Sequence, residues 1–288
     1  MFQVTQVGGD VVSAAPLKLP LELIYLIFHF ALIPYKTDAA FSISLVSSRA
    51  RHFSLPYIFS TLAIRTAPNK SPPIPLHLAT HVRNIWIETV ADLDALTIFE
   101  RCGNATNIAL PGSLLQDLQL SVQHRLEDDP TPHSDCGRLL PCRSLFIIGL
   151  PSHSFAPIIS SPYGRSFFAN ITHLAVRHSI DEDETIPHEC LPNLTHMAFI
   201  LDFHSLYWLG RLLLDAVERT LARDGVEKVL FLLVPPHSHH TFAVRIFRAV
   251  RKARHHWRGW DRVGVTGRPI SLYPAWSKDV DDGVSMWD

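Results

Sequence analysis

The side chains best able to do chemistry in this 288-residue chain are its 17 histidines, its 27 acidic residues and its four cysteines. The spacings that place a nucleophilic serine or hold a phosphate are absent: there is no Gly-x-Ser-x-Gly, no Gly-x-x-x-x-Gly-Lys and no Gly-x-Gly-x-x-Gly. His188-Glu189 is followed by Cys190-Leu191-Pro192, so the two-histidine pattern of a zinc-binding helix is missing. We therefore expect a chain that is not an enzyme, with no catalytic residue, no cofactor and no metal ligand.

Two polar clusters could still hold a metal ion. His237-Ser238-His239-His240 follows two prolines, and we favour a solvated turn that leads into a helix. Asp181-Glu182-Asp183-Glu184 lacks the glycine and the distal glutamate of a calcium loop, which favours a surface loop. The cysteines contain no Cys-x-x-Cys pair and are too few to form a disulfide framework, so we expect reduced, intracellular thiols; they are Cys102, Cys136, Cys142 and Cys190.

Composition limits the classes of partner. The chain is 47% hydrophobic and 18% charged, with a net charge of −1, so no overall charge attracts it to nucleic acid or to acidic lipid. The apolar run from Leu23 to Ile33 is shorter than the roughly 20 residues that span a bilayer. We expect no membrane partner and a location in the cytoplasm, the nucleus or both.

One predicted helix is strongly basic. Residues 241–258 carry six Lys or Arg side chains and no acidic one. Such a face could bind phosphate groups or an acidic partner. The alternative, which we favour, is a solvated outer helix whose positive charges near its C-terminus complement the helix dipole. Nucleic acid is therefore the less favoured partner.

The stretch Leu19–Phe59 predicts three short helices. Pro20 suits the first position of a helix, where its missing N–H costs no hydrogen bond, and Pro34 ends that helix. In residues 21–33 only Glu22 and His29 are polar, so this helix must be covered on more than one side by the chain or by another protein. We expect further helices over residues 38–46 and from Ser47 or Ser48 to Leu55, the last ended by Pro56.

A spaced apolar pattern recurs after residue 80. It reads apolar, two residues, apolar, one residue, apolar, which is the strand signature of leucine-rich repeats. The seven copies begin at Val82, Ala105, Cys142, Ile171, Leu194, Val226 and Trp260. Two copies also share a polar motif, Asn170-Ile171-Thr172-His173-Leu174-Ala175 and Asn193-Leu194-Thr195-His196-Met197-Ala198, and Asn104-Ala105-Thr106-Asn107 is a weaker relative.

Helices are expected between these strands, over residues 92–101, 204–223 and 241–258. Strand–helix units in series form a right-handed parallel stack. The predicted fold class is α/β: a three-helix N-terminal unit followed by an irregular, leucine-rich-repeat-like solenoid with a parallel sheet. The predicted segments are a disordered lead-in (1–17), the helical unit (18–60), a strand and Pro-rich connector (61–78), the repeats (79–275) and a tail (276–288).

The N-terminal stretch resembles an F-box. The resemblance rests on Leu19-Pro20-x-Glu22-Leu23-x-x-x-Ile27-Phe28, then Leu45-Val46-Ser47 and Pro56-x-x-Phe59, and the C-terminal part resembles the repeat-like tails of F-box proteins, notably those of mushroom-forming fungi. Where many F-boxes have Cys-x-x-Trp, this chain reads Ser47–Phe53, and its first helix is unusually apolar. The resemblance implies a substrate-recognition subunit of an SCF-type ubiquitin ligase, which binds a Skp1-like adaptor and through it a cullin. The implied adaptor-binding residues are Leu19, Pro20, Leu23, Ile24, Ile27, Phe28, Leu45 and Val46.

Two other hypotheses remain open. The chain could be a repeat-type scaffold for protein–protein interaction, whose N-terminal helices only cap the solenoid and bind no adaptor. It could also be an enzyme with an unfamiliar site, which a deep pocket lined by His, Asp or Glu would support. The target protein is not identifiable from these residues, because the surfaces of such repeats vary freely.

Overall fold

The computed structural model describes most of the chain except its N-terminus and several connections. The described residues are 19–32, 36–65, 74–88, 95–115, 117, 118, 120, 141–148, 161–177, 188–201, 211–233, 248, 251, 252, 259–267, 272, 273, 276, 277 and 280. The lead-in 1–17, the insertions at 127–137 and 181–184, the histidine cluster 237–240 and most of the basic segment 241–258 lie outside them. Arg248, Arg251 and Lys252 of that segment are described, helical and exposed.

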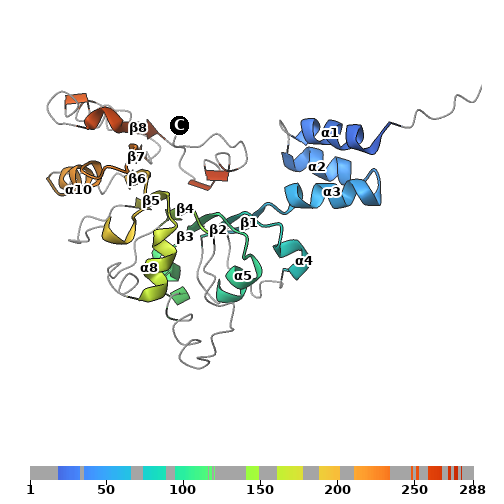
Figure 1. Cartoon of the computed structure of the whole chain (residues 1–288), viewed down its shortest axis with the longest axis horizontal. Helices are drawn as coiled ribbons and strands as arrows, with labels where there is room; N and C mark the ends of the chain where they lie inside the picture. The colour runs from blue at the N-terminus through green and yellow to red at the C-terminus, as the bar shows by residue number, and fades with distance from the viewer. Residues whose placement is uncertain are drawn as a thin grey trace, which may run out of the picture.

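The chain begins with three helices that lie side by side in Figure 1: α1 (Leu21–Leu32), α2 (Lys36–Ser44) and α3 (Ser48–Ile58). α1 begins one residue after Pro20, which we predicted as its first position: the Pro20 carbonyl accepts hydrogen bonds from the backbone N–H groups of Leu23 and Ile24 at 3.1 and 3.2 Å, so Pro20 lies just before the helix. The Ser47 hydroxyl caps α3 by accepting a bond from the Ala50 N–H at 3.1 Å. A side-chain cap thus sets the start of α3.

The prediction that Pro56 ends the third helix was wrong. α3 continues through Pro56 to Ile58, and the Phe59 N–H bonds to the Leu55 carbonyl at 2.9 Å. The proline removes one hydrogen bond from the last turn. Tyr57 and Ile58 pack against the core of the three helices beyond it, and this packing favours helical continuation. Asp38 lies inside the first turn of α2 rather than at its cap.

Within the described residues a single sheet holds eight parallel strands in sequence order (Figure 1). Each strand therefore pairs with the next one along the chain, as repeated strand–helix units require. The strands are β1 (Thr61–Ile64), β2 (Asn84–Ile87), β3 (Asn107–Leu110), β4 (Ser144–Ile147), β5 (His173–Arg177), β6 (His196–Leu201), β7 (Lys228–Leu233) and β8 (Val263–Gly267).

The strand register follows the apolar pattern. The second apolar position of each copy aligns across the whole sheet, through the pairs Leu62↔Ile85, Ile85↔Ile108, Ile108↔Leu145, Leu145↔Leu174, Leu174↔Met197, Met197↔Val229 and Val229↔Val263. The first position of every copy is also buried, just before its strand. The prediction of a parallel α/β sheet built from these copies is confirmed.

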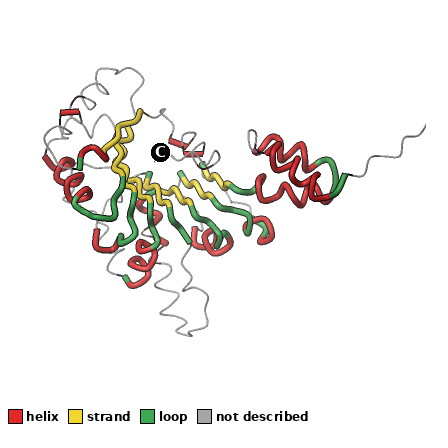
Figure 2. Tube along the Cα trace, turned by 45° about the horizontal axis from the view of Figure 1, so that its top comes forward, coloured by secondary structure: helices red, strands yellow, loops and turns green. Residues whose placement is uncertain are grey.

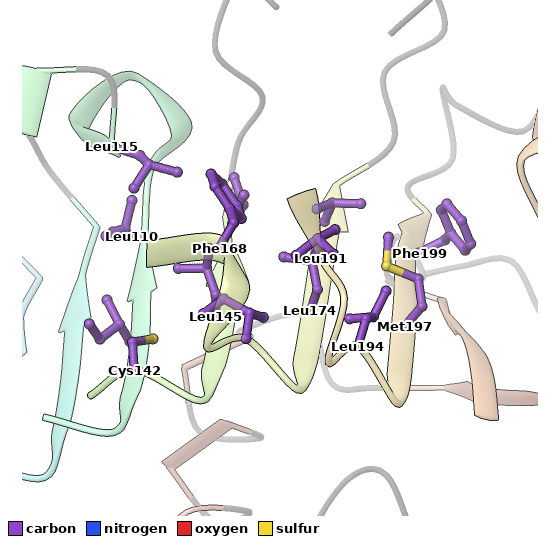
Figure 3. Packing of buried hydrophobic residues seen from close by; sticks show 14 of the residues in the cluster. Leu110, Leu115, Cys142, Leu145, Phe168, Leu174, Leu191, Leu194, Met197 and Phe199 are labelled. Atoms are coloured by element: carbon purple, nitrogen blue, oxygen red, sulfur yellow. The ribbon is translucent and has the colours of Figure 1, made fainter. Parts of the chain in front are cut away.

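Helices cover one face of the curved sheet (Figure 2). They include α4 (Leu76–Ala79), α5 (Ala95–Arg101), α8 (Pro162–Ala169) and α10 (Arg211–Leu221), with short 3₁₀ turns η2 (His188–Cys190) and η3 (Trp260–Arg262). α5 and α10 fall inside the ranges predicted for helices. Figure 3 shows Leu145, Leu174 and Met197 on neighbouring strands, with Phe168 and Leu191 packed close to them. This layer between the strands and the helices is the main core.

The repeated Asn-x-Thr-His motif has a structural role at the start of the strands. The Thr195 and Thr172 hydroxyls donate to the carbonyls of Thr172 and Arg143, one repeat earlier, at 3.0 and 3.2 Å. The Asn193 amide donates to the Ala169 carbonyl at 2.8 Å. The rings of His173 and His196 stack with centroids 4.5 Å apart. The motif therefore joins consecutive repeats, which explains why it returns with the repeat.

The strand expected near residue 61 is the first strand of the sheet. β1 pairs with all four residues of β2, and Leu62 and Ile64 pack against the main core. The helices α1–α3 have a separate core around Leu32, Ala40, Ile43 and Ala50. The chain thus passes from that helical core into the sheet between Ile58 and Thr61.

Three described cysteines are free and buried: Cys102, Cys142 and Cys190. Burial raises the pKa of the Cys102 thiol from 9.0 to about 11 and also raises the pKa of Cys142. For Cys190, burial and then the charge of Glu189 raise the thiol pKa. A buried site favours the protonated, uncharged thiol, so the raised pKa of Cys102 means that its protonated form stabilises the fold. This stabilisation is complete below pH 9.0 and is lost as the pH rises through 9.0 towards about 11.

We expect Cys102 to be alkylated at pH 8 about a hundredfold more slowly in the folded protein than in urea. A rise of the pKa from 9.0 to about 11 lowers the thiolate fraction by that factor, and burial restricts access further. Timed labelling with iodoacetamide and mass spectrometry of the peptides would measure the ratio for Cys102 and Cys142 separately. Equal rates in buffer and in urea would contradict the buried, protonated state.

Candidate protein-docking surface on the N-terminal helices

Helix α1 has two apolar faces. Its inner face carries Tyr25, Phe28 and Leu32, which are spaced by three and four residues and so share one side of the helix. Tyr25 stacks on Phe53 of α3 with ring centroids 5.1 Å apart, and Phe28 approaches the same ring at 6.0 Å. Leu32 is fully buried. This face accounts for the attachment of α1 to the rest of the helical unit.

The outer face is also apolar but lies open to solvent. Leu23, Leu26, Ile27 and Phe30 follow the same spacing on the opposite side of α1, and Leu19 precedes them by one turn. Ile27 is 53% exposed and Phe30 is 61% exposed. An isolated exposed leucine is ordinary on a protein surface, whereas a continuous stripe of large apolar side chains indicates an interaction site.

More exposed apolar residues lie on α2 and in the turn that follows it. Phe41 is exposed on α2, and Leu45 and Val46 in the α2–α3 turn are 80% and 69% exposed. The chain reverses direction between successive helices, so this turn and the start of α1 lie at the same end of the helical unit, away from the sheet (Figure 1). We call the exposed apolar residues of the unit the helical patch: Leu19, Leu21, Leu23, Leu26, Ile27, Phe30, Phe41, Leu45 and Val46.

The structure divides the eight predicted adaptor-binding residues into two groups. Leu19, Pro20, Leu23, Ile27, Leu45 and Val46 are exposed. Ile24 and Phe28 are half-buried, and Phe28 packs on the helical core. Sequence reasoning did not single out Leu21, Leu26, Phe30 or Phe41. The three- and four-residue spacing from Leu23 to Phe30 was the signal that could have identified Leu26 and Phe30.

Polar contacts of the helical unit are few. The Nδ1 atom of His29 lies 3.2 Å from the Tyr57 hydroxyl and joins α1 to α3, and the Arg51 Nε donates to the Ser44 carbonyl at 3.4 Å. Within the described ranges, no three His, Cys, Asp or Glu side chains gather in a way that could hold a metal ion. None of the helices described is long and apolar enough to cross a membrane.

No family model, no curated protein and no solved structure matches the chain. The architecture of the chain is a parallel α/β repeat sheet with an attached helical unit that exposes an apolar patch.

Proposed function

We propose that the chain is a substrate-recognition subunit of an SCF-type ubiquitin ligase. The helical patch would bind a Skp1-like adaptor, and through it a cullin, while the repeat sheet would hold a target protein. The observation that carries the proposal is the exposed apolar stripe of α1, Leu23, Leu26, Ile27 and Phe30, opposite a face that is already packed. This stripe coincides with the stretch that resembles an F-box.

The contribution of this chain would be geometric. A rigid sheet that holds a target beside the adaptor raises the local concentration of the target's lysines at the ubiquitin-carrying enzyme, and no side chain of the chain itself needs to react. The parallel strands, with one copy of the apolar pattern at each strand from β2 to β8, support an assignment of the sheet as leucine-rich-repeat-like.

The alternative role, in which α1–α3 only cap the solenoid, has less support. A cap buries its apolar surface against the end of the repeat stack. Here the helical core and the main core are separate clusters, and the helical patch stays exposed. A capping role would not explain why α1 has a second apolar face that is exposed to solvent.

Replacing Leu45 and Val46 with serine is expected to abolish co-purification of the full chain with a Skp1-like adaptor. Both side chains are mostly exposed, so the variant should fold like the wild type and differ only in its contact with a partner. Co-expression followed by size-exclusion chromatography would measure recovery of the complex, with circular dichroism as the test of folding. Leu76→Ser is a matched control, because Leu76 is 65% exposed but lies on α4 beside the sheet. Unchanged recovery of the adaptor with the double variant would count heavily against the proposal.

A further inference from the structure

A row of polar side chains crosses the starts of the strands, on the face of the sheet opposite the covering helices. These residues alternate with the core positions, and the strand register places them side by side. All of them except Asn84 are half-buried, so part of each side chain still reaches solvent. We call them the polar row; in strand order they are Asn84, Asn107, Ser144, His173, His196 and Lys228.

The two ends of the polar row differ in chemistry. At the β1–β3 end the side chains bond to one another: the Asn107 amide donates to Asn84 Oδ1 at 2.8 Å, and the Asn84 amide donates to Thr61 Oγ1 at 3.0 Å. These groups are neutral and hold neighbouring strands together. The β5–β7 end consists instead of two imidazoles and an ammonium group, which can carry positive charge.

The two histidines are held in a defined orientation. Their rings stack with centroids 4.5 Å apart and planes 15° apart. Nδ1 of His173 lies 2.8 Å from the Thr172 hydroxyl, and Nδ1 of His196 lies 2.9 Å from the Thr195 hydroxyl. Each hydroxyl directs its one proton at a backbone carbonyl, so it accepts from the ring and Nδ1 carries hydrogen. Nε2 is then the atom at which each ring gains a proton, without a change in its contacts to threonine.

The ionisable side chains on this face of β4–β7 are basic. Among the described residues that alternate onto it, they are the two histidines, Arg177 and Lys228, and none is acidic. Arg143 is exposed just before β4, and Glu227 is exposed just before β7, outside the row. Arg177 and Lys228 give this part of the sheet a positive charge at neutral pH, which favours an anionic partner.

We infer that His173, His196 and Lys228 bind an acidic segment of a protein, with two carboxylates two residues apart. Neighbouring strands lie about 4.8 Å apart, so these three side chains span roughly 10 Å across the sheet. Alternate residues of an extended peptide lie about 7 Å apart, and glutamate side chains bridge the remainder. The inference deepens the proposed function, on which it rests, because the acidic segment would belong to the target.

Binding at this place should strengthen as the pH falls. Imidazoles ordinarily gain their charge between about pH 8 and pH 5. In register the pair lies between Ser144 and Lys228, so the described charged group beside it is an ammonium, which opposes protonation of the rings in the free chain. Carboxylates of a bound segment offset that repulsion. Binding therefore raises the proton affinity of the histidines, and by linkage the affinity for the segment is higher at low pH.

The test uses the full chain and a fluorescein-labelled peptide of four Gly-Glu repeats at low ionic strength. Fluorescence anisotropy should show about tenfold tighter binding at pH 6.0 than at pH 8.0, where glutamate stays ionised, and no binding of a Gly-Gln peptide. His173→Gln with His196→Gln should remove the pH dependence, and Lys228→Gln should weaken binding about tenfold at both pH values. Arg219→Gln is the matched control, because Arg219 is exposed on α10, on the covered side of the sheet.

Three results would overturn the inference: no binding of the Gly-Glu peptide, equal wild-type affinity at the two pH values, or an equal loss in Arg219→Gln and Lys228→Gln. The last would show attraction to charge in general. If the double histidine variant does not fold, judged by circular dichroism, the wild-type pH comparison and Lys228→Gln still decide. Adaptor co-purification with the same proteins separates the two proposals. Adaptor recovery without peptide binding removes this inference alone, and peptide binding without adaptor recovery contradicts the proposed function while supporting the acidic-segment site.

Discussion

Replacing Leu23 and Ile27 together with alanine should weaken binding of a Skp1-like adaptor on the order of a hundredfold or more, with little change in the thermal midpoint of the protein. Buried apolar anchors at interfaces typically cost roughly 2 kcal/mol or more each when truncated, and about 1.4 kcal/mol corresponds to a factor of ten. Both side chains are exposed in the free chain, so their truncation removes little intramolecular packing. Titration calorimetry with purified adaptor would give the ratio of dissociation constants.

The control for that experiment is an exposed apolar residue outside the helical unit. Leu76→Ala truncates one side chain that is 65% exposed beside the sheet and should leave adaptor affinity unchanged. A double variant that binds the adaptor as tightly as the wild type would remove α1 from the interface. A large drop in the thermal midpoint would instead show that the outer face of α1 is packed in the free protein.

The sheet was predictable because each strand from β2 to β8 carries its own copy of the apolar pattern. One copy of the apolar pattern specifies which residues enter the core and where a strand begins, and pairing in sequence order then sets the register without further information. The pair Leu174↔Met197 and the buried residues Ile171 and Leu194 illustrate how directly the two copies align. The helix end at Pro56 was missed because packing of Tyr57 and Ile58 outweighs the loss of one hydrogen bond.

The candidate docking surface was predictable only in part. A helix that is apolar nearly all round must have two covered faces, and this much follows from composition. Which residues face the chain's own core depends on where α3 lies. Ile24 and Ile27 illustrate the difference: they are the same residue type three positions apart, yet Ile24 is half-buried and Ile27 is exposed.

Both faces of the sheet are buried, since Trp86 and Phe146 form a second core cluster with Trp276, and the strand sequences carry a signal of this. Strands with one solvated face alternate apolar and polar residues, whereas strands buried on both faces read as continuous apolar runs. The runs Ile85-Trp86-Ile87 and Leu145-Phe146-Ile147 are of the second kind. They indicate a second cover, but no local pattern identifies Tyr273 and Trp276 as part of it, because that contact joins residues far apart in the sequence.

The second large effect concerns Phe53, which holds the helical unit together. Its ring lies within 5.1 to 6.0 Å of the rings of Tyr25, Phe28 and Tyr57. Phe53→Ala should cost roughly 2–3 kcal/mol, somewhat less than the 3–5 kcal/mol typical of a fully buried phenylalanine because Phe53 is half-buried. A unit of about 40 residues has little more stability than that to lose. We therefore expect α1–α3 to unfold at ambient temperature while the sheet stays folded.

Hydrogen exchange with mass spectrometry would locate the loss. Amides of α1 and α3 should lose protection in Phe53→Ala, and those of β2 and β5 should keep it, because the helical core and the main core are separate. Phe30→Ala is the matched control: the same change on the exposed face of α1 should keep full protection and lower only adaptor affinity. If Phe53→Ala also opened the sheet, the two cores would form one cooperative unit, and α1–α3 would act as a cap of the solenoid.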